Sequence, residues 1–204
     1  MRSYLALAFA VGLYVPASAA EAATAIFAGG CFWSVESNFD SVPGVTGTVS
    51  GFIGGWTENP TYNDVTYGDT GHREAVLVTY DPEVVSYEQL LMTFWMTIDP
   101  TDAGGQFCDR GSSYRTGLFP VEEGQAEAAA ASRDQIAART GYTIVTEIIE
   151  GQTFYPAEDY HQDFHINNPQ RYEAYRVGCG RDAVIARLWG EMAFLGTAAN
   201  PYPD

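Results

Sequence analysis

The sequence predicts an α+β protein: a two-layer sandwich with a mixed, ferredoxin-like sheet core, irregular loops and a coil-rich C-terminal tail. Short apolar segments alternate with segments of helical periodicity, in the order β-α-β-β-α-β-α-β. The hydrophobic fraction of 46% and the aromatic fraction of 14% are sufficient for a packed core. Because neither repeats nor a linker are found, we expect one domain over residues 20–204, with its tail from about residue 170.

In the first half of the chain, glycine and proline residues separate the predicted elements. The apolar pattern predicts these elements: a strand over 24–28, a helix over 31–40, a strand over 45–52, an irregular loop over 51–71 and a strand over 74–80. The loop is rich in Gly, Asn, Asp, Thr and Tyr and is long for a compact domain. Loops of this length are usually functional.

The second half contains clearer helix boundaries. Ser86 with Gln89 forms a capping-box pattern, and Gly141 is the residue type that commonly ends a helix. The pattern predicts these elements: a helix over 87–98, a loop over 99–113, a strand over 114–119, a helix over 120–141, a strand over 142–150 and a final helix over 182–194.

The charge of the chain excludes several functions. It carries 26 acidic and 10 basic side chains, a formal net charge of −16, and all ten basic residues are arginine. A polyanion is repelled by nucleic acid and by anionic membranes, so we expect neither as a partner. Without lysine, neither Schiff-base chemistry nor a P-loop is available.

Residues 1–19 have the pattern of a secretory signal peptide. Arg2 is followed by an apolar stretch over 5–15 and by small residues that favour cleavage near Ala19. A first strand or helix of the fold is the alternative. We therefore expect an exported, periplasmic protein whose three cysteines meet an oxidising environment. An odd number of cysteines leaves at least one of them free or exchanging partners.

Cys31 is the strongest candidate nucleophile. It follows a strand and two glycines and opens a helix, where unpaired amides and the helix dipole are expected to lower the pKa of a thiol. The alternative is a buried cysteine that packs as a small hydrophobic residue. Phe32 and Trp33 beside it could form a wall for an S-methyl group, or both could belong to the core.

Seven motifs occur in the order and spacing typical of one enzyme family. They are GCFW at 30–33, NPTY at 59–62, GDTGHREAV at 68–76, YDP at 80–82, DRGSSYR at 109–115, FYPAEDYHQ at 154–162 and NP at 168–169. On these motifs the chain closely resembles the methionine sulfoxide reductase A family over about residues 24–169. GCFW alone would be weak, but the set is specific.

The resemblance implies a peptide-methionine (S)-S-oxide reductase, which reduces the S epimer of methionine sulfoxide, free or in proteins, and so repairs oxidised proteins. Cys31 would attack the sulfoxide sulfur, and Glu74 would donate a proton to the sulfoxide oxygen. A donor of this kind must be protonated when substrate binds, which requires burial. Without the resemblance, the sequence favours Glu74 as a surface carboxylate at the end of a strand.

The other residues implied by the resemblance bind the substrate. Tyr62 and Tyr114 match the tyrosines that hydrogen-bond the sulfoxide oxygen, and Asp109 matches the residue that orients the substrate backbone. Phe32 and Trp33 would form the pocket for the methyl group.

Oxygen transfer would leave a sulfenic acid on Cys31, which a second thiol converts to a disulfide. Cys179 lies between two glycines in the tail and is our first choice for this resolving role. Cys108 adjoins Asp109 and is the alternative: it could resolve instead, pair with Cys179 in a relay, or be a buried, inert thiol.

The resemblance implies no bound cofactor and an external dithiol reductant of the thioredoxin type. Cytosolic thioredoxin cannot reach an exported enzyme, so we expect a thioredoxin-like partner that is fed across the inner membrane. We expect no nucleic-acid partner, no membrane contact after signal cleavage, and a monomer.

Three further interpretations remain open. His161 and His165 are four residues apart, but the HExxH order is absent, and we expect no metal site. A cysteine hydrolase or acyl-transferase would pair Cys31 with a histidine base. A non-catalytic secreted domain would use its cysteines for structure alone.

Overall fold

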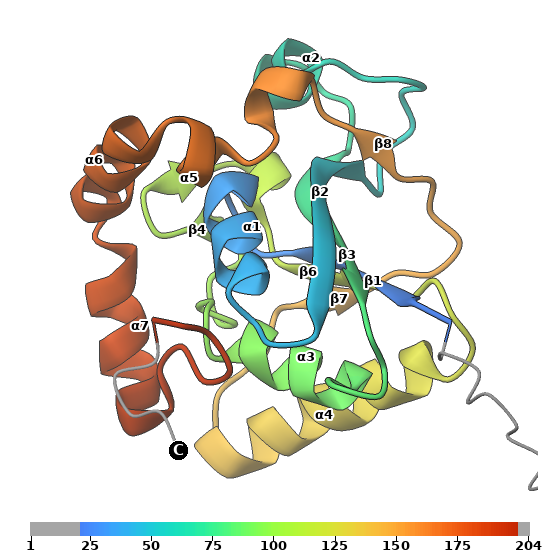
Figure 1. Cartoon of the computed structure of the whole chain (residues 1–204), viewed down its shortest axis with the longest axis vertical. Coiled ribbons are helices and arrows are strands. Elements are labelled where there is room, and N and C mark those ends of the chain that lie inside the picture. Colours follow the sequence, from blue (N-terminus) through green and yellow to red (C-terminus); the bar gives the residue numbers. More distant parts are fainter. Residues whose placement is uncertain (1–20, 200–204) are drawn as a thin grey trace, which may run out of the picture.

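The computed structural model describes residues 21–199 (Figure 1). The expected signal segment over 1–19 lies outside the described residues. The strands are β1 (Ala23–Ala28), β2 (Val45–Ile53), β3 (Arg73–Tyr80), β4 (Gly105–Gln106), β5 (Asp109–Arg110), β6 (Gly117–Phe119), β7 (Glu147–Ile148) and β8 (Tyr155–Pro156). The α-helices are α1 (Phe32–Asp40), α2 (Tyr62–Tyr67), α3 (Tyr87–Trp95), α4 (Gln125–Thr140), α5 (Phe164–Asn167), α6 (Pro169–Cys179) and α7 (Arg181–Trp189).

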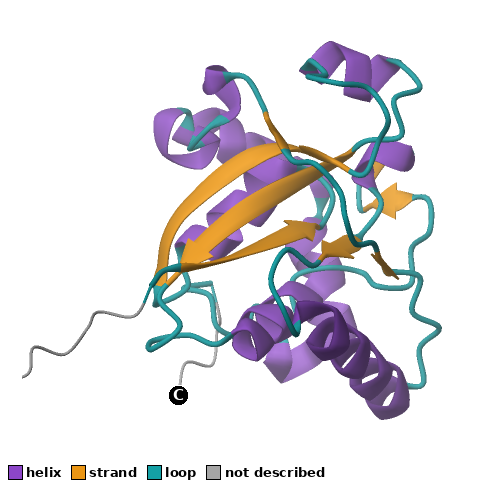
Figure 2. Ribbon diagram, turned by 90° about the vertical axis from the view of Figure 1, so that its right-hand side faces the viewer, coloured by secondary structure: helices purple, strands orange, loops and turns teal. Residues whose placement is uncertain are grey.

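A six-stranded mixed sheet forms the centre of the fold, with the strand order β7-β6-β1-β3-β2-β8. The β6–β7 pair is parallel, and the other neighbouring pairs are antiparallel. Figure 2 shows the long strands crossing the molecule with helices packed against them. The predicted α+β class with a mixed sheet is confirmed, whereas the finer ferredoxin-like assignment stays a prediction.

Strand alternation divides the core into two clusters. In β1, Ala25 and Phe27 belong to the larger cluster, which also contains buried residues of α1, α3, α4 and α7. Ile26 and Ala28 point to the opposite face and belong to a smaller cluster. Because side chains of a strand alternate between faces, both faces of β1 are apolar and buried. The sheet therefore provides a rigid base for the segment that follows β1.

Both predicted loops contain regular structure. Helix α2 lies within the first, and it begins at a capping box in which Thr61 and Asp64 satisfy each other's backbone amides. The second contains the β4–β5 hairpin and a 3-10 turn over Ser112–Tyr114. Conversely, the strand expected over 142–150 shrinks to the two residues of β7.

The prediction of a coil-rich C-terminal tail is wrong. Helices α6 and α7 follow one another with only Gly180 between them, and Figure 1 shows them in orange and red along one side of the molecule. The sequence of α6 has no clear apolar stripe, and Tyr172 is its one buried residue, so periodicity could not reveal it. None of the helices within residues 21–199 has the length and apolarity needed to span a membrane.

Glu36 is a buried acid in the middle of α1. Its side chain is 0% exposed, and neither carboxyl oxygen has a hydrogen-bond partner among the described residues. Burial, and then the nearby charge of Asp40, raise the pKa of Glu36 to about 7. Ionisation of Glu36 in the folded state is therefore unfavourable, and it weakens the fold at alkaline pH.

We expect the substitution Glu36→Gln to stabilise the protein at pH 8 but not at pH 5. The pKa of Glu36 is higher in the folded state than in the unfolded state. The contribution of the protonated Glu36 to stability is therefore complete below the unfolded-state pKa, and it is lost as the pH rises through about 7. Urea unfolding at both pH values should show a gain over the wild type that grows by up to about 3 kcal/mol between pH 5 and pH 8. The exposed Glu123→Gln is the control. An equal gain at both pH values would contradict the prediction.

Candidate active site around Cys31

Strand pairing brings Cys31 and Glu74 together from positions 43 residues apart in the sequence. Strands β1 and β3 are antiparallel, with Phe27 opposite Val76, so the end of β1 lies beside the start of β3. The turn after β1 requires Gly30, which has a φ of +88° and would place a Cβ 2.6 Å from the side chain of Gln106. Cys31 then caps α1, and its carbonyl accepts hydrogen bonds from the Ser34 and Val35 amides at 3.1 and 3.3 Å.

Glu74, on β3, is a buried acid that lies beside the N-terminus of α1. It is 1% exposed, and its Oε2 accepts a hydrogen bond of 2.9 Å from the Phe32 amide. Burial raises the pKa of Glu74 to about 8, although the Phe32 amide and the charge of Arg181 lower it. Glu74 is therefore protonated at neutral pH, as a proton donor must be. The surface-carboxylate interpretation of Glu74 is wrong.

The expectation that the helix N-terminus lowers the pKa of Cys31 is also wrong. Cys31 is free and 7% exposed; burial raises its pKa, and the charges of Glu74 and Asp109 raise it further. The helix amide of Phe32 is used by Glu74 rather than by the sulfur. Cys31 is consequently a neutral thiol in this state, and it must lose its proton in the course of any reaction.

Two tyrosines extend the polar side of the site. Tyr62 opens α2, where its amide donates a 3.0 Å hydrogen bond to Glu158, and Tyr114 ends the 3-10 turn over Ser112–Tyr114. Burial, followed by the charge of Glu74, raises the pKa of each. Both hydroxyls therefore keep their protons and can donate to an oxygen placed near Glu74.

Asp109 lies on β5 and is bound by a residue that the sequence analysis did not identify. The Tyr175 hydroxyl donates a 2.5 Å hydrogen bond to Asp109 Oδ2, and its polar group also lowers the pKa of Cys31. Tyr175 comes from α6 and lies edge-on to Trp33, with ring centroids 5.7 Å apart. Helix α6 therefore contributes to the cover over the site.

The aromatic wall predicted beside Cys31 is built from several elements. Trp33 stacks on Phe164 at a centroid distance of 3.7 Å, and its indole nitrogen donates a 3.0 Å hydrogen bond to His161 Nδ1. The Phe32 ring lies 4.9 Å from the His161 ring and 6.4 Å from that of Tyr62. Phe32 is fully buried, whereas Trp33 is partly exposed at the surface.

The two other cysteines are bonded to each other. Cys108 and Cys179 form a disulfide that links the β4–β5 hairpin to the end of α6. Cys108 is exposed, so it is not a buried thiol, and its amide donates a 3.2 Å hydrogen bond to Cys179 Sγ. Cys179 Sγ lies 4.0 Å from Asp109 Oδ2, which places the disulfide at the edge of the Cys31 site.

The side chains of the three histidines contact different residues and do not form a common site. His161 accepts from Trp33, and burial lowers its pKa to about 4, whereas His165 faces Asp40 at 3.4 Å. His72 bonds the Gly55 amide and the Thr57 carbonyl, and so holds the loop after β2. Within residues 21–199, the side chains of Cys108, Asp109 and Cys179 lie close enough together to bind a metal ion. Cys108 and Cys179 are bonded to each other, however, so neither offers a thiolate ligand.

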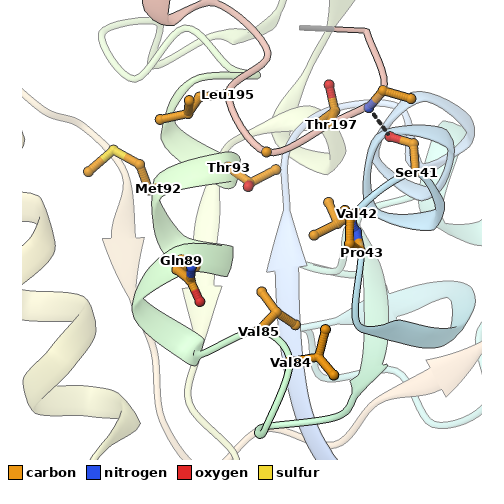
Figure 3. Close-up of a pocket in the computed structure, with 12 residues that line it drawn as sticks. Ser41, Val42, Pro43, Val84, Val85, Gln89, Met92, Thr93, Leu195 and Thr197 are labelled. Atoms are coloured by element: carbon orange, nitrogen blue, oxygen red, sulfur yellow. Dashed lines mark hydrogen bonds between the residues drawn. The ribbon is translucent and has the colours of Figure 1, made fainter. Parts of the chain in front are cut away.

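A cavity of about 610 Å³ lies elsewhere in the molecule. Figure 3 shows it between α3, the turn after α1 and the segment that contains Leu195 and Thr197, with a hydrogen bond of 3.1 Å between the Ala198 amide and Ser41 Oγ at its rim. Its walls are mostly apolar and contain none of the residues around Cys31. It is therefore distinct from the candidate active site, which Tyr175 and α6 keep covered.

Sequence reasoning missed Tyr175 and Arg181. Tyr175 is four residues before Cys179, which is one helical turn, but this signal is readable only once α6 is known to be a helix. Arg181 is 1% exposed and acts on Cys31, Glu74 and Asp109. Its place two residues after Cys179 was the one available hint.

Comparison with known proteins shows which family the chain belongs to. The Rhizobium meliloti protein "Peptide methionine sulfoxide reductase MsrA 2" is 52% identical over 186 residues, which cover 91% of this chain and 93% of the relative. The Caulobacter vibrioides protein of the same name is 52% identical over 183 residues, 88% of this chain and 92% of the relative.

Solved structures of similar proteins have the same fold. Methionine sulfoxide reductase A of Corynebacterium diphtheriae superposes with a TM-score of 0.69 at 34% identity, over 72% of this chain and 76% of that chain. Saccharomyces cerevisiae Mxr1 in complex with Trx2 gives a TM-score of 0.50 at 21% identity, over 76% and 92% of the two chains. A model of the family described as peptide methionine sulfoxide reductase matches residues 23–193. The chain therefore belongs to the peptide methionine sulfoxide reductase family.

Proposed function

We propose that this chain reduces methionine S-sulfoxide, free or within oxidised proteins, to methionine. The observation that carries the proposal is the pairing of Cys31 with a buried carboxylic acid: Glu74 binds the first amide of α1 and has a pKa of about 8. A sulfoxide oxygen is a poor leaving group until it gains a proton, and Glu74 is placed to supply one. The relatives named above are called methionine sulfoxide reductases, which supports this class of substrate.

The first half-reaction transfers one oxygen atom. The sulfur of Cys31 attacks the sulfoxide sulfur, while Glu74 protonates the oxygen and the Tyr62 and Tyr114 hydroxyls stabilise it by hydrogen bonding. Methionine leaves and the oxygen remains on Cys31 as a sulfenic acid, so the substrate is reduced and Cys31 is oxidised by two electrons. Phe32 and Trp33 hold the S-methyl group, and Asp109 orients the substrate backbone after Tyr175 releases it.

A relay of thiols would return Cys31 to its starting state. Cys179 attacks the Cys31 sulfenic acid and releases water, which forms a Cys31–Cys179 disulfide. Cys108 then attacks Cys179, which gives a Cys108–Cys179 disulfide and frees Cys31. The disulfide and the free thiol described above are the products expected at this stage, and they support a relay through both cysteines.

An external dithiol would complete the cycle. The exposed Cys108 is the sulfur that a thioredoxin-like reductant can reach, and the solved complex of yeast Mxr1 with Trx2 favours this class of partner. The signal pattern of residues 1–19 leads us to propose that both proteins work outside the cytoplasm. A cysteine hydrolase is less well supported, because the groups that act on Cys31 are Glu74, Asp109, Tyr175 and Arg181 rather than a histidine.

The substrate and the nucleophile can be tested together. With a small dithiol as electron donor, the wild type should reduce a blocked methionine S-sulfoxide and leave the R epimer unchanged, as measured by chiral separation of the products. Cys31→Ser should abolish this turnover because it removes the attacking sulfur. Reduction of neither epimer by the wild type would refute the proposed activity.

The pKa of Glu74 predicts that the activity falls at alkaline pH. Glu74 loses its proton as the pH rises through about 8, so kcat/KM should fall above that pH. Glu74→Gln cannot donate a proton, and its rate should be about 100- to 10,000-fold lower at pH 7. Steady-state rates from pH 6 to pH 10 provide the measurement. A wild-type rate that keeps rising to pH 10 would show that Glu74 is not the donor.

The relay predicts different endpoints for two serine variants. With excess substrate and no reductant, Cys108→Ser should stop at a Cys31–Cys179 disulfide, whereas Cys179→Ser should accumulate the Cys31 sulfenic acid, detectable with dimedone by mass spectrometry. The first turnover of Cys108→Ser should stay within about twofold of the wild type, because Cys108 acts after oxygen transfer. Thioredoxin-driven turnover of Cys108→Ser at the wild-type rate would exclude the relay.

A further inference from the structure

Arg181 is a buried cation without an anionic partner in contact. It is 1% exposed, and among residues 21–199 no carboxylate lies within 4.0 Å of its guanidinium nitrogens. Its Nε has no hydrogen-bond partner there, and its Nη1 and Nη2 both donate to the Gly29 carbonyl at 3.4 Å. Burying an unpaired charge is costly, so the position of Arg181 calls for a counter-charge that is present in another state of the protein.

The guanidinium lies behind the turn that leads to Cys31. Gly29 accepts its hydrogen bonds, and a Cβ at Gly30 would lie 3.1 Å from Nη2. The group also lies over the Phe107 ring, 4.4 Å from its centroid. Arginine is always charged in proteins, so a fixed positive charge lies directly behind the residues before Cys31.

The other ionisable groups near Cys31 are acids. They come from five elements: Glu74 on β3, Asp109 on β5, Tyr62 on α2, Tyr114 at the end of the 3-10 turn, and Tyr175 on α6. Glu74 and Asp109 raise the pKa of Cys31, whereas Arg181 lowers it. Arg181 is thus the cation that opposes the carboxylates when negative charge develops on the Cys31 sulfur.

We propose that Arg181 is an electrostatic positioning residue, whose buried charge stabilises the Cys31 thiolate through its place behind the Gly29–Gly30 turn. The inference rests on the proposed role of Cys31 as the nucleophile. The thiolate that forms during turnover is the missing counter-charge of the guanidinium, and the carbonyl of Gly29 keeps the two groups in fixed relation.

The same charge would favour the last step of the thiol relay. When the Cys108 thiolate attacks Cys179, an S–S bond forms between them, the Cys31–Cys179 bond breaks, and the electron pair leaves on Cys31. Thiol exchange is faster when the leaving thiolate is stabilised. Arg181 therefore assists the departure of Cys31, and it belongs to the same segment as Cys179.

The test measures the ionisation of Cys31 apart from sulfoxide turnover. In the enzyme with an intact Cys108–Cys179 disulfide, Cys31 is the one free thiol, so its alkylation by iodoacetamide from pH 7 to pH 9 reports its thiolate fraction. Arg181→Met removes the charge and Arg181→Lys keeps it. Arg181→Gln is a second charge-free variant in case Arg181→Met does not fold, and circular dichroism checks the folding of each.

We expect the charge-free variants to alkylate about tenfold more slowly at pH 8, and Arg181→Lys to recover most of the wild-type rate. With sulfoxide substrate, kcat should fall by about the same factor while KM changes by less than about twofold. Arg176→Met is the matched control, because it removes a tail arginine that pairs with Asp182. If a variant only loosened the tail, Cys31 would become more exposed and its alkylation would be faster, whereas loss of the charge makes alkylation slower.

Charge-free variants that alkylate as fast as the wild type, or faster, would overturn the role of Arg181. So would a loss in Arg181→Lys equal to that in Arg181→Met. Failure of the wild type to reduce sulfoxide would instead refute the proposed activity. The two failures are distinguishable, because alkylation needs no substrate.

Discussion

The hydrogen bond from the Phe32 amide to Glu74 is the contact on which the site depends. It joins the first free amide of α1 to a side chain at the start of β3, so the helix that begins at Cys31 is fixed to the central sheet. Both partners are buried, and a buried amide or carboxyl without a partner is costly. The relative position of the Cys31 thiol and the Glu74 carboxyl therefore depends on this one contact.

Burial then determines the protonation of the site. It raises the pKa of Glu74 to about 8 and raises the pKa of Cys31 as well. At neutral pH, both groups are therefore uncharged in most of the protein molecules. This arrangement avoids two like charges side by side in a medium that cannot screen them. It also means that negative charge on sulfur must be created during the proposed reaction, which gives the unpaired guanidinium of Arg181 a physical purpose.

The C-terminal helices close the site. The Cys108–Cys179 disulfide joins the end of α6 to the β4–β5 hairpin, and Tyr175 on the same helix occupies Asp109. Substrate binding at Asp109 would require Tyr175 to leave, and the disulfide restrains the helix that carries it. The Cys108–Cys179 disulfide thus coincides with a covered Cys31, while the cavity between α3 and the C-terminal segment contains none of these residues.

The sequence by itself determined the elements whose signals are local. Short apolar segments predicted β1 and β3, the Ser86–Gln89 capping box predicted the start of α3, and the family motifs predicted Cys31 and Glu74 as residues of one site. The tertiary structure alone decided that the pKa of Cys31 rises, that Cys108 bonds Cys179, and that Tyr175 and Arg181 lie beside Cys31. Capping boxes and short apolar segments depend on residues a few positions apart, whereas desolvation and charge depend on groups that only folding brings together.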